Sequence, residues 1–168
     1  MKVIKKQTNS KMCLICGINN DAGLKAPFYE MEDHSVMSVF KFSEHHQSYP
    51  GRAHGGMIST MLDEIVGRAI WIDEPLMWGV TMDIKVKFRK PVPLETTVYA
   101  KGIITKNTSK FFVGVGYIYD VYGNILAEAN VNYFKLPIEK ISDTATHDDI
   151  NIYIEDDVIE INFIQIDK

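Results

Sequence analysis

His54, Gly55 and Gly56 open a stretch with helical periodicity, and two carboxylates, Asp63 and Glu64, lie in the middle of it. Backbone N–H groups in the first turn of a helix have no acceptor within the helix, and the helix dipole adds partial positive charge there. Glycine has no side chain to hold a substrate away. The pattern therefore predicts a site that polarises a thioester or ester carbonyl and stabilises the oxyanion formed on attack. The alternative is that the glycines only permit a tight turn.

The two carboxylates lie on opposite margins of the apolar stripe, each about 130° from its centre, so helix geometry does not choose between them. Glu64 precedes Arg68 by four residues, which is the orientation that favours a surface ion pair. Asp63 has no such partner, and its small neighbours Ser59 and Thr60 leave room for a ligand. A carboxylate in this position could act as a nucleophile or as a general base toward water.

His54 and the cysteines each allow more than one interpretation. A histidine just before a helix either caps and packs or takes part in catalysis, and no carboxylate or cysteine stands at a spacing that would complete a metal site with His45 and His46. Cys13 and Cys16 form a single CxxC, without a second Cys/His pair at zinc-finger spacing. Two free thiols in a reducing compartment are the favoured interpretation. A zinc half-site completed by another subunit and a redox pair are the alternatives.

Hydrophobic periodicity, residue composition and turn signals predict one long helix and five strands. The apolar positions that make the helix a core element are Met57, Ile58, Met61, Leu62, Ile65, Val66, Ala69 and Ile70. A strand at residues 35–42 precedes it, and strands at 80–89, 95–106, 110–121 and 125–136 follow, which we expect to pair as an antiparallel meander. In the strand from Val80, alternation predicts that Val80, Met82, Ile84, Val86 and Phe88 share a buried face, with Thr81, Asp83, Lys85, Lys87 and Arg89 opposite.

The composition is that of one globular domain, with 168 residues of which 46% are apolar. Residues 1–138 carry 16 Lys and Arg against 13 Asp and Glu, whereas residues 139–168 carry 2 against 9. No nucleic-acid-binding motif, apolar membrane span or secretory signal is visible, so we expect a cytoplasmic protein without nucleic-acid or membrane partners.

Three segments follow from these patterns. We expect an N-terminal loop segment with the CxxC at 1–34, the folded domain at 35–138, and an acidic C-terminal extension at 139–168. The extension is predicted to form a linker and two short strands around an acidic turn, which cover a sheet edge or lie against a partner subunit.

The stretch "YPGRAHGGMISTMLDE" resembles the signature of hotdog-fold acyl-CoA thioesterases of the phenylacetate-degradation (PaaI-like) type. In that family HGG opens the central helix and an acidic residue follows the histidine by nine positions, which selects Asp63 over Glu64. The resemblance extends over roughly residues 13–136. It implies an α+β hotdog fold, in which a long central helix is wrapped by a curved antiparallel sheet of five or six strands.

The resemblance also implies roles for single residues. Asp63 would activate water or attack the thioester, the Gly55 N–H would polarise the carbonyl, His54 would shape the site, and Thr81 would orient the water or the carboxylate. The family's active site is shared between two subunits, so a homodimer or homotetramer is implied. Some relatives carry a polar residue before HGG, a role that Gln47 or Ser48 could fill here. This chemistry requires no metal and no diffusible cofactor, so none is expected. Coenzyme A enters only as part of the substrate.

The remaining expectations concern the substrate. Lys85, Lys87, Arg89 and Lys90 could receive the phosphates of coenzyme A, although a solvated strand face is the alternative. Gly56 and Glu64 are also expected to bind the substrate. The residues Met57, Met61, Trp71, Met77 and Trp78 suggest an apolar or aromatic acyl group, or else plain core.

The predicted function is therefore hydrolysis of an acyl-CoA to free acid and CoA. The alternative is a non-catalytic hotdog module that binds acyl-CoA or a small acid, because one fold hosts several functions. Hydration of an enoyl-CoA is a weaker enzymatic alternative.

Overall fold

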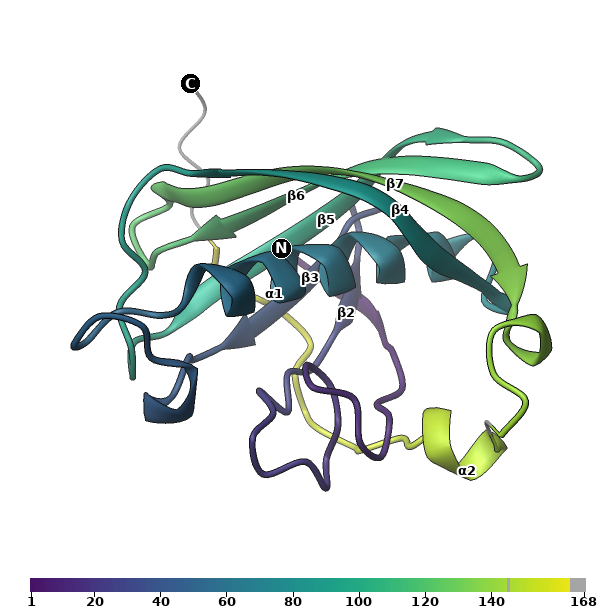
Figure 1. Ribbon diagram of the computed structural model, residues 1–168, viewed down its shortest axis with the longest axis horizontal. Coiled ribbons are helices and arrows are strands. Elements are labelled where there is room, and N and C mark those ends of the chain that lie inside the picture. Colours follow the sequence, from purple (N-terminus) through teal and green to yellow (C-terminus); the bar gives the residue numbers. More distant parts are fainter. Residues whose placement is uncertain (145, 164–168) are drawn as a thin grey trace.

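A computed structural model describes residues 1–144 and 146–163 of the chain. One long helix, α1 (Gly55–Ala69), lies against a curved seven-stranded antiparallel sheet (Figure 1). The strands are β1 (Val3–Lys6), β2 (Tyr29–Met31), β3 (Val36–Phe40), β4 (Met77–Phe88), β5 (Val98–Asn107), β6 (Phe111–Tyr119) and β7 (Ile125–Pro137), in the sheet order β1-β2-β3-β5-β6-β7-β4. Short helical turns lie at Glu44–His46, Ile70–Ile72, Ile138–Lys140 and α2 (His147–Ile150). The hotdog architecture predicted from the resemblance is confirmed.

The helix forms where the apolar period predicted it, and its apolar stripe packs on the concave face of the sheet. Ile58, Met61, Leu62, Ile65 and Val66 are all buried there. The close approach of helix and sheet depends on glycine, because a Cβ added at Gly102 on β5 would lie 2.3 Å from the carbonyl oxygen of Ile65.

The expected pairing of the last four strands is partly wrong. β5, β6 and β7 form a meander, but β4 pairs with β7 and not with β5. The segment between β4 and β5 contains Pro91 and Pro93 and is too long for a tight hairpin. A chain of this length, at about 3.3 Å per residue, can cross the ends of the intervening strands, which are about 4.8 Å apart. Periodicity identified the strands but not their partners.

β4 also breaks the predicted alternation. The register with β7 shifts between Thr81 and Asp83, so that Thr81 lies opposite Tyr133 and Ile84 opposite Val131. This β-bulge at Met82 turns the side chain of Thr81 toward α1, on the same face as Ile84. The prediction that Thr81 faces away from the core is therefore wrong. β4 is an edge strand, and Val80, Met82, Ile84 and Phe88 remain exposed rather than buried.

Both ends of the chain add to the sheet. The segment 1–34, expected as loop, contributes β1 and β2, which explains why the sheet has seven strands instead of five or six. The described part of the C-terminal extension does not form the two predicted strands, and residues 164–166 of the predicted second strand lie outside the described residues. It makes isolated bridges at Asn9–Ile152 and Lys2–Glu160, and so covers the β1 edge, which was one of the two expected roles.

Within the described part of the chain, no helix combines the length and apolar character needed to cross a membrane.

Candidate active site

The N-terminus of α1 leaves one glycine N–H group available. His54 is the N-cap, and its Nδ1 accepts a hydrogen bond of 2.9 Å from the Gly56 N–H. The His54 N–H donates to the carbonyl oxygen of His46 at 2.7 Å, which fixes the loop before the helix. Among the described residues the Gly55 N–H has no acceptor. Of the two predicted donors, Gly55 is thus free to bind a substrate oxygen, whereas Gly56 is used by the cap.

Asp63 lies near the middle of α1, beside β4 and β7. Its Oδ1 accepts hydrogen bonds from the hydroxyl of Thr81 at 2.9 Å and from the hydroxyl of Tyr133 at 3.0 Å. The Tyr133 hydroxyl also lies 2.6 Å from the backbone carbonyl oxygen of Asp63. The structure therefore brings together the predicted Asp63 and Thr81, and adds Tyr133. Tyr133 was not singled out from the sequence, although a buried tyrosine hydroxyl usually needs a hydrogen-bond partner.

Burial raises the pKa of the Asp63 carboxyl above its ordinary value, although the hydrogen bonds from Thr81 and Tyr133 act in the opposite direction. Glu64 adds a smaller repulsive contribution that also raises it. The pKa of Tyr133 is raised as well, first by burial and then by the Asp63 charge, so its hydroxyl stays neutral and donates. A carboxylate with a raised pKa is better suited to accept a proton than an ordinary aspartate.

Glu64 points away from this group. Its Oε1 accepts a hydrogen bond from Arg68 Nε at 2.8 Å, so the pair predicted from the four-residue spacing forms, but Arg68 is buried and not at the surface as expected. Its Oε2 lies 3.9 Å from Cys13 Sγ. The structure separates the two neighbouring carboxylates, with Asp63 toward the β4–β7 side and Glu64 toward the N-terminal CxxC.

The other predicted binding residues lie around the helix start and on the outer sheet face. Gln47 Oε1 accepts the Gly51 N–H at 2.9 Å, and the Ser48 N–H donates to the Arg52 carbonyl at 2.9 Å, so both hold the loop before α1.

On the outer face of the sheet, two of the predicted basic residues share one acidic partner. Glu128 Oε1 forms ion pairs with Lys87 Nζ at 3.3 Å and with Arg89 Nη2 at 2.8 Å. Lys85 and Lys90 form no ion pair among the described residues.

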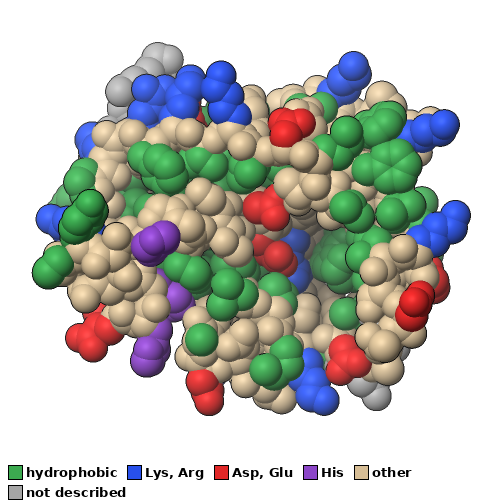
Figure 2. Space-filling view, in the orientation of Figure 1, with side chains coloured by type: hydrophobic (Ala, Val, Ile, Leu, Met, Phe, Trp, Pro, Cys, Tyr) green, Lys and Arg blue, Asp and Glu red, His purple; other side chains and the backbone are tan. Residues whose placement is uncertain are grey.

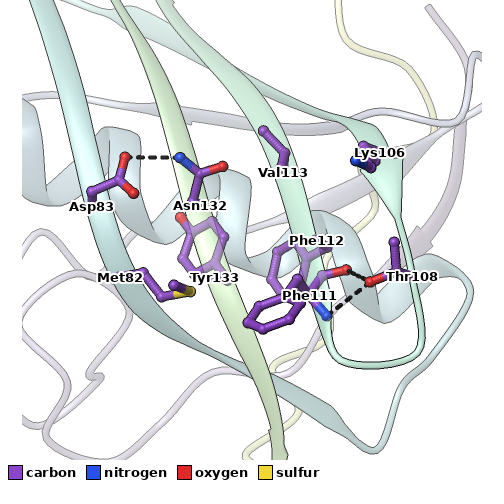
Figure 3. Close-up of a pocket in the computed structure, with 9 residues that line it drawn as sticks. All are labelled: Met82, Asp83, Lys106, Thr108, Phe111, Phe112, Val113, Asn132 and Tyr133. Atoms are coloured by element: carbon purple, nitrogen blue, oxygen red, sulfur yellow. Dashed lines mark hydrogen bonds between the residues drawn. The ribbon is translucent and has the colours of Figure 1, made fainter.

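A cavity of about 290 Å³ lies over β4, β6 and β7, near the turn between β5 and β6 (Figure 3). Its wall residues are Met82, Asp83, Lys106, Thr108, Phe111, Phe112, Val113, Asn132 and Tyr133. Tyr133 belongs both to the cavity lining and to the Asp63 group: its buried ring stacks on Phe112, with the ring centroids 4.5 Å apart, and its hydroxyl donates to Asp63. The expected pocket wall was different. Trp71, Met77 and Trp78 line a second, larger hollow beyond the end of α1, and Met61 is core.

Comparisons with known proteins agree with this fold. Residues 50–121 match the family model of the Thioesterase superfamily, a segment that contains HGG, Asp63 and Thr81. A helix that opens with HGG and packs against a curved antiparallel sheet defines the class of fold, a hotdog fold, and residues 50–121 within it are similar to the thioesterase superfamily. The predicted resemblance is confirmed at this level.

Individual proteins are similar to this chain in sequence or in fold. Acyl-coenzyme A thioesterase THEM4 of Mus musculus is 29% identical over 116 residues, which cover 68% of this chain and 49% of that protein. The chain thus spans about half the length of this curated relative. A phenylacetic acid degradation-related protein from Ralstonia eutropha shares the fold, with a TM-score of 0.60 and 17% identity over 66% of this chain and 85% of that one. A Streptococcus mutans protein solved with acetyl-CoA has a TM-score of 0.59 and 21% identity over 67% of this chain and 89% of its own.

Proposed function

We propose that this protein hydrolyses an acyl-CoA thioester to the free acid and CoA, as a PaaI-like member of its superfamily. The observation that carries the proposal is Asp63, a partly buried carboxylate whose pKa is raised and whose orientation is held by two hydroxyl donors. The relatives named as thioesterases, and the bound acetyl-CoA in the Streptococcus mutans protein, support the substrate class. We place the reaction in the cytoplasm, the compartment expected for two reduced cysteines.

In the reaction, the Asp63 carboxylate takes a proton from water as the water oxygen attacks the thioester carbon. Alternatively, the carboxylate attacks that carbon itself, and water then hydrolyses the resulting mixed anhydride to the free acid and restores Asp63. The Gly55 N–H donates to the carbonyl oxygen, which becomes an oxyanion in the tetrahedral intermediate. When the C–S bond breaks, the CoA thiolate leaves and takes up a proton. His54 acts in this scheme as the residue that shapes the helix N-terminus.

One copy of the chain does not bring these two groups to the same bond. Gly55 and Asp63 are eight residues apart on α1, which corresponds to about 12 Å along the helix axis. The proposal therefore needs a second subunit that supplies the Gly55 N–H to the Asp63 of the first. The unpaired edge of β4 suits such an interface, because Val80, Met82, Ile84 and Phe88 are exposed along it. Exposed apolar side chains are visible on the face that carries α1 and β4 (Figure 2).

The structure also suggests which basic residues bind the CoA phosphates. Lys85 and Lys90 are the freer of the four predicted contacts for the CoA phosphates, because Lys87 and Arg89 already share Glu128.

The test is release of CoA thiol from short, medium, long and aromatic acyl-CoA substrates, measured with a thiol-trapping dye. Wild-type protein should turn over part of this panel, and Asp63→Asn should lose about a hundredfold or more, the usual scale for a general base. Asp73→Asn, an exposed aspartate that contacts His34, is the matched control and should keep full activity. Saturable acyl-CoA binding without thiol release from any substrate would contradict hydrolysis and favour the non-catalytic module.

A further inference from the structure

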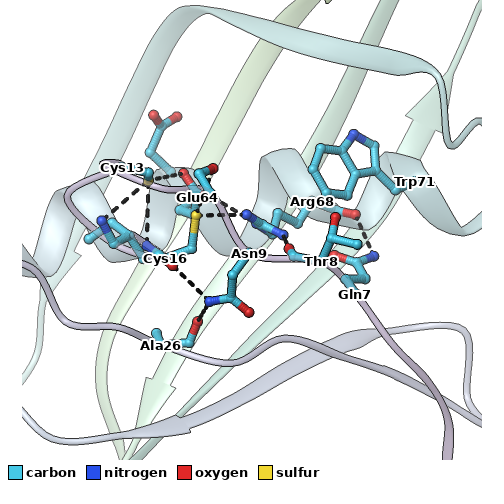
Figure 4. A network of polar contacts seen from close by, with 12 residues as sticks. Gln7, Thr8, Asn9, Cys13, Cys16, Ala26, Glu64, Arg68 and Trp71 are labelled. Atoms are coloured by element: carbon cyan, nitrogen blue, oxygen red, sulfur yellow. Dashed lines mark hydrogen bonds and ion pairs between the residues drawn. The ribbon is translucent and has the colours of Figure 1, made fainter. Parts of the chain in front are cut away.

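The fold brings the two cysteines of the CxxC next to a carboxylate that is distant in sequence. Cys13 Sγ, Cys16 Sγ and a carboxylate oxygen of Glu64 all lie within 4.8 Å of one another (Figure 4). Glu64 is 51 positions from Cys13 in the chain. We propose that this cysteine–glutamate cluster binds a single Zn²⁺ ion, at a site separate from the Asp63 group.

The backbone around the cysteines is already arranged as a thiolate-binding turn. The N–H groups of Ile15 and Cys16 point at Cys13 Sγ, at 3.3 and 3.4 Å, and the Gly17 N–H closes the turn onto the Cys13 carbonyl at 2.8 Å. A Cβ at Gly17 would lie 2.3 Å from that carbonyl oxygen, so the turn requires glycine. Two N–H donors aimed at one sulfur stabilise its anionic form, which is the form that binds metals.

Glu64 leaves one oxygen for the cluster. Its Oε1 binds Arg68, whereas its Oε2 faces Cys13 Sγ at 3.9 Å. Arg68 holds the arrangement from outside, because its guanidinium also donates to Cys16 Sγ at 2.9 Å and to the Thr8 carbonyl at 2.7 Å. A buried residue that hydrogen-bonds two ligands orients them as outer-shell partners of metal sites do.

Charge balance favours a divalent ion here. Two thiolates and the Glu64 carboxylate carry three negative charges, and the buried Arg68 supplies only one positive charge. A divalent cation makes the cluster neutral, which removes most of the cost of burying its charges.

The donor set suits zinc. Thiolates and carboxylates are both zinc ligands, at about 2.3 Å and 2.0–2.2 Å respectively, and three protein ligands with one water is an established coordination. Tetrahedral ligand atoms at those lengths are separated by about 3.5–3.8 Å, so an inward movement of about 1 Å closes the site. Cys13 is only partly buried, so water can reach the fourth position.

The experiment is a titration of the reduced full-length chain with Co²⁺, a spectroscopic substitute for Zn²⁺, under anaerobic conditions. We expect a thiolate-to-cobalt charge-transfer band that saturates at one ion per chain and disappears when Zn²⁺ is added. Zn²⁺ should also raise the Tm of the wild-type protein, because the ion would join the N-terminal segment to α1, and a chelator should reverse this shift.

Variants assign the ligands. Cys13→Ser and Cys16→Ser should each abolish the charge-transfer band, and Glu64→Gln should weaken the affinity about tenfold or more. Asp63→Asn, which changes the neighbouring carboxylate on the other side of α1, should bind Co²⁺ as the wild type does. Because Asp63→Asn also tests hydrolysis, the metal site and the proposed function can fail separately. The proposal is overturned if reduced wild-type protein gives no thiolate band, or if the band survives in both cysteine variants. Circular dichroism of each variant excludes unfolding as the cause of a lost band.

Discussion

Asp63 and Tyr133 form the pair of side chains on which the proposed chemistry depends most directly. The tyrosine hydroxyl reaches both the carboxylate and the backbone carbonyl of Asp63, while its ring packs on Phe112. Thr81 supplies the second hydroxyl. The two donors favour the ionised carboxylate, whereas burial opposes it, so the pKa of Asp63 reflects the difference between these effects.

Tyr133→Phe removes one donor and leaves the aromatic stacking in place. The pKa of Asp63 should rise further, because a hydrogen bond to its charged form is lost. The acidic limb of the profile of kcat/KM against pH should therefore move to higher pH. Thr81→Val should move it in the same direction, and a profile that is unchanged in both variants would show that Asp63 is not the titrating group.

The raised pKa of Asp63 also predicts a pH-dependent stability. A carboxyl whose folded-state pKa is raised contributes most below its unfolded value of about 3.9, and this contribution is lost as the pH rises through the folded value. Asp63→Asn does not ionise, so the variant should be more stable than the wild type at neutral pH. The difference in urea midpoint should vanish below about pH 3.9. A variant that is less stable at neutral pH would contradict the direction of the shift.

The helix α1 positions both halves of the proposed site, and its first turn depends on the His54 cap. His54→Ala should lower the free energy of unfolding by about 1 kcal/mol, the usual cost of losing an N-cap acceptor. His54→Asn keeps a capping oxygen and should restore most of that loss in urea unfolding. If activity stays low in His54→Asn while stability recovers, the imidazole has a role beyond capping. Equal stability of His54→Ala and wild type would contradict the cap.

The edge strand β4 supplies the other side of the Asp63 group. Its bulge changes which side chains face α1, and without the bulge Thr81 would point to the outer face. Among the described residues β4 is the last strand at one edge of the sheet, and apolar side chains are exposed along its length.

At the scale of the whole molecule, the proposed active site is complete only in a dimer. Ile84→Glu places a charge among the exposed apolar residues of β4, and we expect it to shift the dimer toward monomer in light scattering with parallel loss of activity. Ile4→Glu changes an exposed isoleucine of β1, far across the sheet, and should leave both properties unchanged. A fully active Ile84→Glu monomer would contradict the shared site.

The sequence by itself determined the features that depend on neighbours along the chain. Apolar periods located α1 and β4, and residue composition between turn signals located four further strands. The four-residue spacing predicted the Glu64–Arg68 pair, and the HGG resemblance selected Asp63. Only the tertiary structure decided that β4 pairs with β7, that a bulge turns Thr81 toward Asp63, and that Tyr133 joins them. It alone placed Glu64 beside the two cysteines. The physical reason is that local periodicity records which side of an element is buried, whereas contacts between distant segments depend on the path of the whole chain.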